Sequence, residues 1–308
     1  MFALETGEPW TAIQCSDFNL PNRWQHGEDI TPILAQRSGA GFNLLRCWTH
    51  FDLSPGIGTF LDIDYSRIPE FLALCASFGL RVEFTAYTSI ERFGHWERLV
   101  EACQGEPNVL LELVNEGTDP RNLIDMQRYA KPTGVLTSRG SGGAEGVPPW
   151  EPWDYVTFHT NGSSEEQRKI GHNAMEKTAD ILKWYGPTLT NETSRYPDVG
   201  MWGYYQKNAE GKDVWVQHPL ERQQHLAYDS AAGAALLCAG SCFHSVQGKN
   251  STLWDSNAVT VAMSWAAGAK SVPLAYQHQG YTRRDDLLTP DLLRVYQRGS
   301  SPVVKIRK

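Results

Sequence analysis

The sequence predicts one α/β domain built as a (β/α)8 TIM barrel, with a short C-terminal β-rich appendage. Short apolar runs alternate with helix-length amphipathic segments, and this alternation is typical of parallel strands joined by crossover helices. Eight apolar runs of strand length occur along the 308 residues. The length also suits one such barrel, for which about 250 residues are typical. A barrel of eight strands is therefore the expected architecture.

The elements are expected in a regular order along the chain. A hairpin over residues 2–13 comes first and leads into the barrel. The predicted strands are 11–15, 42–48, 81–86, 109–114, 134–137, 155–158, 188–190 and 236–243. The predicted helices are 30–38, 68–78, 96–103, 123–130, 165–184, 220–235 and 256–267. The Gly/Pro-rich segment 140–153 leaves little room for a helix after the fifth strand.

The domain organisation follows from these elements. We expect the barrel to occupy residues 1–269. The tail over residues 270–308 holds short β-like runs, and we expect it to pack on the barrel as an appendage. It is too short for a separate domain.

Composition excludes several classes of partner. A net charge of −7 without a stripe of Lys and Arg argues against nucleic acid and against an acidic membrane surface. No stretch approaches the roughly 20 apolar residues of a membrane helix, and the N-terminus lacks the regions of a signal peptide. The sequence would suit a cytoplasmic protein, but also one released by lysis or carried on a phage particle. Oligomeric state stays open.

Polar side chains follow the predicted strands at the end where barrels of this kind place their active sites. The pair Asn115-Glu116 closes the fourth strand, and the pair Asn191-Glu192 closes the seventh. Glycoside hydrolysis needs two carboxyl groups across one bond, one to protonate the leaving oxygen and one to attack carbon or activate water. Glu116 and Glu192 are therefore the candidate catalytic pair.

Other residues at or beside the strand ends are candidates for substrate binding. Aromatic side chains offer flat faces on which sugar rings stack, and the chain holds 11 Trp, 12 Tyr and 11 Phe. The predicted binding set is Arg46, Trp48, His50, Asn115, His159, Asn161, Trp202 and His244. A structural ion pair for Arg46 and a core hydrogen bond for His159 are the alternatives. Several stacking faces along the rim favour endo action.

Four sequence elements follow one another in strand order: the run Gly41-Phe-Asn-Leu-Leu-Arg46, the pair Asn115-Glu116, His159 and Glu192. In this order they resemble clan A of the glycoside hydrolases, which includes the cellulase-like and mannanase-like families. The resemblance covers most of the barrel, and it implies a retaining mechanism without a cofactor.

The same resemblance implies roles for individual residues. Glu116 would be the acid/base and Glu192 the nucleophile. Asn115 would contact the sugar 2-hydroxyl, and Arg46 would be the charge partner that keeps Glu192 ionised. The chain departs from the clan after the eighth strand, where Phe243-His244-Ser245 stands in place of the usual Trp.

Two other functions stay open at this stage. The unusual ending of the eighth strand permits a barrel that binds carbohydrate without hydrolysing it. A metal-dependent hydrolase would need His50, His159 and His244 to converge as ligands, yet the first strand is not followed by a His-x-His pair. The six Cys also lack paired metal spacing and are expected as buried thiols. We therefore expect a retaining β-glycoside hydrolase with a carbohydrate substrate and no metal or organic cofactor.

Overall fold

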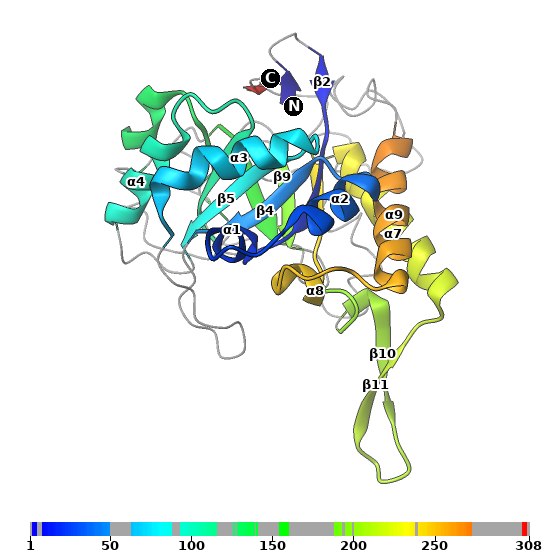
Figure 1. The fold of residues 1–308 in the computed structure, drawn as a ribbon. Helices are drawn as coiled ribbons and strands as arrows, with labels where there is room; N and C mark the ends of the chain where they lie inside the picture. The colour runs from blue at the N-terminus through cyan, green and yellow to red at the C-terminus, as the bar shows by residue number, and fades with distance from the viewer. Residues whose placement is uncertain are drawn as a thin grey trace.

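The fold was analysed in a computed structural model of the whole chain (Figure 1). The residues that the structure describes are 2–4, 8–49, 63–87, 93–115, 126, 128–138, 140, 154–159, 188–192, 195–198, 200–237, 240–272 and 304–306.

An all-parallel sheet of eight strands forms the centre of the molecule, in the order β7-β6-β5-β4-β3-β12-β9-β8. Its strands are β3 (Ala12–Ser16), β4 (Leu44–Trp48), β5 (Arg81–Tyr87), β6 (Val109–Val114), β7 (Leu136–Ser138), β8 (Val156–His159), β9 (Thr188–Glu192) and β12 (Gly240–Phe243). Each overlaps one predicted strand. The predicted start of the last strand is wrong, because Leu236 and Leu237 still belong to the preceding helix.

The sheet curls, so that its two outer strands come together. Ser138 at the end of β7 forms a parallel β-bridge with Tyr155, directly before β8. The amide of Asp154 also donates to the carbonyl of Thr137 at 3.1 Å. Because all eight strands are parallel, their carboxyl ends lie at one end of the sheet.

Helices follow the strands and cover the outside of the sheet (Figure 1). They are α1 (Leu20–Gln25), α2 (Thr31–Gly39), α3 (Ile68–Ser77), α4 (Phe93–Cys103), α7 (Leu220–Leu237), α8 (Val246–Lys249) and α9 (Ser256–Ser271), with 3-10 turns at η1 (Tyr65–Arg67), η2 (Lys131–Thr133) and η4 (Gly200–Trp202). The predicted helices at 30–38, 68–78, 96–103, 220–235 and 256–267 are confirmed. Residues 126 and 128–130 are helical as expected, while 165–184 lie outside the described residues.

Two apolar clusters pack on the two faces of the sheet. Alternate strand residues such as Leu45, Phe84 and Leu111 face outward and pack with the helices in the large core. The other parity places apolar side chains near the beginnings of the strands, in a second cluster made of Phe2, Ala12, Leu44, Leu110, Tyr155 and Leu189. Further along the strands several inward positions are polar, among them Arg46, Glu83 and Glu112, and these residues form the site described below.

The N-terminal hairpin covers the end of the sheet at which the strands begin. The strands β1 (Phe2–Leu4) and β2 (Pro9–Trp10) pair antiparallel, as the predicted hairpin requires, and β1 also pairs parallel with β13 (Val304–Ile306) near the C-terminus. Both chain ends therefore lie side by side (Figure 1). Phe2 is fully buried against Tyr155, with ring centroids 5.6 Å apart.

A second hairpin projects from the opposite end of the molecule (Figure 1). It consists of β10 (Gly203–Lys207) and β11 (Asp213–Gln217), paired antiparallel between β9 and α7. Tyr204 and Tyr205 are among its exposed residues.

The described cysteines confirm the expected thiols: Cys15, Cys47, Cys75, Cys103 and Cys242 are all buried and free. Cys238 lies outside the described residues. Among the described residues, the helices are all too short or too polar to cross a membrane.

Candidate active site

The carboxyl ends of β6, β8 and β9 carry the residues that the sequence selected. Asn115 follows β6 directly, whereas Glu116 lies outside the described residues, as do His50 and Asn161. His159 and Glu192 end β8 and β9 and are register partners in the parallel ladder. A register shift between Phe158 and His159 precedes this pairing, and such irregularities change which residue of a strand faces a given side.

Arg46 on β4 is a fully buried cation that contacts Glu112 of β6 and Asn115, the residue after β6. Its Nε and Nη2 donate to one oxygen of Glu112 at 3.0 and 2.6 Å. Its Nη2 also donates to Oδ1 of Asn115 at 2.7 Å. Both side chains of the ion pair have no exposed surface. In the described part of the chain, the partner carboxylate of Arg46 is thus Glu112, and the side chain of Glu192 lies outside that part.

Glu112 is the most densely hydrogen-bonded group of this interior. Besides Arg46, the hydroxyl of Thr85 donates to its Oε2 at 2.6 Å, and the hydroxyl of Thr157 donates to its Oε1 at 2.7 Å. Ser138 in turn donates to Thr157, because its own oxygen already accepts from two backbone amides. Donors from β4, β5 and β8 thereby converge on one carboxylate of β6.

A second buried carboxyl, Glu83 on β5, lies one strand away. Nε2 of Gln14 donates to its Oε2 at 2.5 Å, and the phenol of Tyr155 lies 2.7 Å from its Oε1. Burial, and next the negative charge of Glu112, raise the pKa of Glu83 to about 7, against the lowering effect of Arg46 and of the two hydrogen bonds. A carboxyl with such a pKa holds its proton over much of the physiological range.

Two aromatic side chains, Phe18 and Trp48, lie near Arg46, and His244 stacks on Phe18. Phe18 and Trp48 have ring centroids 4.7 Å apart, and the guanidinium carbon of Arg46 lies 5.6 Å from each ring. His244 stacks on Phe18 at 5.4 Å, and its Nδ1 is 3.0 Å from the hydroxyl of Ser16. All three rings are buried: Phe18 and Trp48 pack near the guanidinium, and His244 packs on Phe18.

Trp202 belongs to a different environment. It is fully buried and meets Tyr196 and Phe243 edge to face, at 5.2 and 6.2 Å between ring centroids. The structure therefore places Trp202, the last residue of η4, in the core against Phe243 of β12, with no face left for a sugar ring.

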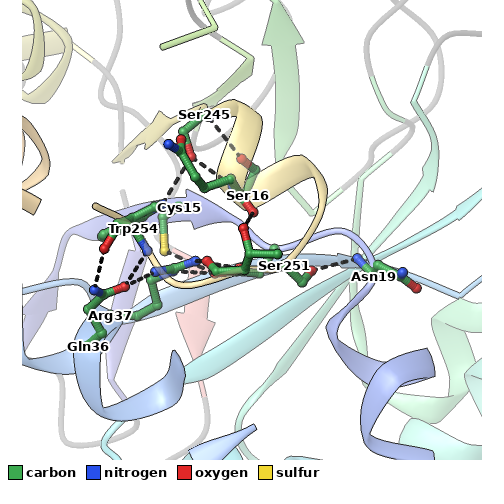
Figure 2. A network of polar contacts seen from close by, with 12 residues as sticks. Cys15, Ser16, Asn19, Gln36, Arg37, Ser245, Ser251 and Trp254 are labelled. Atoms are coloured by element: carbon green, nitrogen blue, oxygen red, sulfur yellow. Dashed lines mark hydrogen bonds and ion pairs between the residues drawn. The ribbon is translucent and has the colours of Figure 1, made fainter. Parts of the chain in front are cut away.

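A separate polar network fixes the loops after β3 and β12 (Figure 2). Arg37 of α2 donates from Nε and Nη2 to the two oxygens of Asp17 at 2.8 and 2.9 Å, and its guanidinium carbon lies 3.7 Å from the ring centroid of Trp254. The indole of Trp254 donates to Ser245 at 3.0 Å. This network ties α2 to the segment that carries His244.

Within the described residues, His, Cys, Asp and Glu side chains do not gather in a group of three that could hold a metal ion. His50 and the side chain of His159, which the metal-dependent alternative requires, lie outside these residues.

The sequence interpretation missed Glu83 and Glu112. Each is a lone carboxylate inside an otherwise apolar strand run, at an inward position where a charge must be paired or neutralised. That signal was present in the sequence, because Glu112 stands four residues before Glu116 on the same strand run.

Comparison with known proteins gives a likeness of fold. No family model and no curated protein matches the sequence. The exo-β-1,4-mannosidase Op5Man5 from Opitutaceae bacterium strain TAV5 matches with a TM-score of 0.57 and 11% identity over 99% of this chain and 71% of its own. A broad-specificity endoglucanase from an uncultured bacterium matches with a TM-score of 0.54 and 12% identity, over 87% of this chain and 91% of its own.

A family 5 glycoside hydrolase, a mannosidase from Rhizomucor miehei, gives a TM-score of 0.52 at 12% identity over 86% of this chain and 94% of its own. At such identities the likeness is one of fold. The chain therefore has the parallel α/β fold of these glycosidases.

Proposed function

We propose that this protein is a retaining β-glycoside hydrolase in which Glu116 is the acid/base and Glu192 the nucleophile. The observation that carries the proposal is the position of the two Asn-Glu pairs. Asn115 directly follows β6, with Glu116 next to it in the sequence, and Asn191-Glu192 ends β9 at the same end of one parallel sheet. The fold shared with solved glycosidases supports it.

The proposal includes closure of the sheet into a complete (β/α)8 barrel, supported by the bridge between Ser138 and Tyr155. In a closed barrel β6 and β9 are separated on the short side by β7 and β8 alone. Residues that end these strands would then face one another across the barrel mouth, which is where barrel enzymes bind substrate. The tail after α9 would pack on the barrel through β13.

The chemistry divides between the two carboxyl groups. Glu192 attacks the anomeric carbon while Glu116 gives its proton to the leaving oxygen, and a glycosyl-enzyme ester forms. Glu116 then takes a proton from a water molecule as the oxygen of that water attacks the anomeric carbon. The ester bond to Glu192 breaks, and a sugar of retained configuration is released. The mechanism requires the two carboxyl groups about 5–5.5 Å apart.

Asn115 has a defined part in this scheme. Its Oδ1 already accepts from Arg46 at 2.7 Å, which leaves the amide NH2 group to donate. A donor directed at the sugar 2-hydroxyl strengthens binding in the transition state. The substrate class proposed is a neutral β-linked polysaccharide, with β-1,4-mannan and β-glucan as the first candidates because the matched structures are named for mannosidase and endoglucanase activity.

The test is release of reducing ends from β-linked mannans, glucans, xylans and galactans. We expect Glu116→Gln and Glu192→Gln to lose at least about 10³-fold in rate. Glu210→Gln, at an exposed position in the β10–β11 hairpin, is the matched control and should stay within twofold. Azide should rescue Glu192→Ala as a glycosyl azide of inverted configuration.

Other outcomes would assign the protein differently. Sugar binding without turnover by the wild type would make it a carbohydrate-binding barrel, an alternative that the buried His244 at the end of β12 favours. Activity that a chelator abolishes would indicate a metal-dependent hydrolase. A fall in viscosity that precedes the release of small sugars would establish endo action.

A further inference from the structure

In the part of the sheet interior that the structure describes, two carboxyl groups lie beside one cation. Glu83 and Glu112 are both fully buried, and the described charged group that balances them is Arg46. The residues that face Glu83 come from four strands: Gln14 of β3, Arg46 of β4, Glu112 of β6 and Tyr155 next to β8. Two ionised carboxylates beside one guanidinium would leave a net negative charge in a dry interior, which is costly.

The hydrogen bonds locate the proton that removes this charge. The phenol oxygen of Tyr155 lies 2.7 Å from Oε1 of Glu83 and 3.1 Å from the carbonyl oxygen of Leu111. A phenol has one proton, and an ionised Glu83 would make both neighbours acceptors. A proton on Oε1 of Glu83 resolves the conflict, because Glu83 then donates to Tyr155 and Tyr155 donates to Leu111.

Glu112 shows the opposite pattern. Arg46, Thr85 and Thr157 all donate to its two oxygens, and Arg46 forms an ion pair with it. It therefore carries the negative charge of the pair. Arg46 is held by two of its N–H groups on Glu112, and the same Nη2 reaches Asn115.

We propose that Glu112 is a positioning residue which, with a proton held on Glu83, fixes the guanidinium of Arg46 and through it the amide of Asn115. Its part in catalysis rests on the proposed function, because it acts through the contact of Asn115 with the sugar. Without Glu112 the guanidinium would lose the carboxylate that its Nε and Nη2 contact, and it would move or draw in water.

Glu83→Gln and Glu112→Gln are a matched pair of variants. Gln reproduces a protonated carboxyl, since it can donate to Tyr155 and accept from Gln14, so Glu83→Gln should keep the fold and a thermal midpoint at pH 7 at or above that of the wild type. Glu112→Gln should lower the midpoint strongly. Its kcat should fall at least about 10²-fold with a smaller change in KM, as expected when a transition-state contact is lost.

A third variant keeps the test decisive where Glu112→Gln fails to fold. Glu112→Gln/Arg46→Met removes both charges together, and such replacement of a buried ion pair is often tolerated. It should regain most of the lost thermal stability but not kcat. Recovery of wild-type kcat in this double variant, or an unchanged kcat in a folded Glu112→Gln, would overturn the positioning role.

Infrared difference spectra of the intact wild-type protein test the proton directly. The stretching band of protonated carboxyls should be present at pH 5.5. One component of this band should be lost in Glu83→Gln, and the same component should remain in Glu112→Gln/Arg46→Met. A spectrum unchanged by Glu83→Gln would refute the assignment. These spectra and the thermal midpoints do not depend on hydrolysis, so they distinguish failure of this proposal from failure of the glycosidase assignment, which Glu116→Gln and Glu192→Gln test.

Discussion

At the scale of single residues, the interior of this sheet combines a fixed cation with two carboxyl groups of different character. Both carboxyls are buried to the same degree, so burial alone does not separate them. The donors separate them: Arg46 and two hydroxyls converge on Glu112, whereas Glu83 has an amide and a phenol.

The raised pKa of Glu83 predicts how stability depends on pH. The folded state holds this proton up to about pH 7, whereas an unfolded Glu, with its ordinary pKa of 4.5, releases it earlier, so the folded state binds more protons between these two values. The free energy of unfolding should therefore fall as pH rises from 4.5 to 7. The full loss is on the order of 3 kcal/mol, at about 1.4 kcal/mol per pKa unit.

Urea denaturation of the wild type and Glu83→Gln at several pH values measures this effect. The two proteins should have similar stability slopes below pH 4.5, and Glu83→Gln should become the more stable one as pH approaches 7. Parallel profiles over the whole range would contradict a raised pKa at this residue.

At the scale of elements, the strand pattern of the sheet was largely predictable and its polar interior was not. The run 109–114 was predicted with the bounds that β6 has, because β-branched and Leu residues are bounded there by turn residues on both sides. The start of the last strand was misplaced because the Ala-rich end of α7 continues directly into small residues. Short helix α1 was missed, since six residues give no period.

The candidate site was likewise predictable only in part. Position at a strand end selects Arg46, Asn115 and Glu192, and this needs only the strand order. The contacts of Arg46 with Glu112 and of Trp202 with Phe243 depend on which face each residue takes and on long-range packing. A single sequence does not contain that information in a local pattern.

The contact between β6 and the segment after β7 gives a prediction at this scale. Gly140 has φ of +94°, and a Cβ there would lie 1.5 Å from the carbonyl oxygen of Val114, the residue before Asn115. Gly27 has a similar φ of +86° but open space around the Cβ position. Gly140→Ala should therefore displace the end of β6, while Gly27→Ala meets only backbone strain of about 1–2 kcal/mol.

Chemical denaturation of the two variants separates the clash from the strain. Gly140→Ala should cost at least about 2 kcal/mol more than Gly27→Ala, because overpacking against backbone adds to the shared φ penalty. It should also reduce sugar hydrolysis more than its control does. Equal losses in both variants would mean that the close approach to Val114 does not constrain β6.

At the scale of the whole molecule, the two ends of the sheet are built from different kinds of residue. The beginnings of the strands are closed by an apolar cluster that includes Phe2, and the hairpin that carries Phe2 is held by β13 from the other end of the chain. The polar network begins next to this cluster, where the ring of Tyr155 contacts Phe2 and its hydroxyl contacts Glu83. The terminal strands thus protect the buried carboxyls from water.

This arrangement predicts two linked effects of Phe2→Ala. Loss of a fully buried ring should lower the free energy of unfolding by about 3–5 kcal/mol, while Tyr205→Ala, at a side chain that is 65% exposed, should change it by less than about 1 kcal/mol.

Water admitted beside Tyr155 should also reduce the desolvation of Glu83. Its pKa should then move back toward 4.5, and the fall in stability between pH 4.5 and 7 should become shallower. Urea denaturation of both variants at several pH values measures the two effects together. A large loss of stability with an unchanged pH profile would show that Phe2 supports the fold without shielding the carboxyl pair.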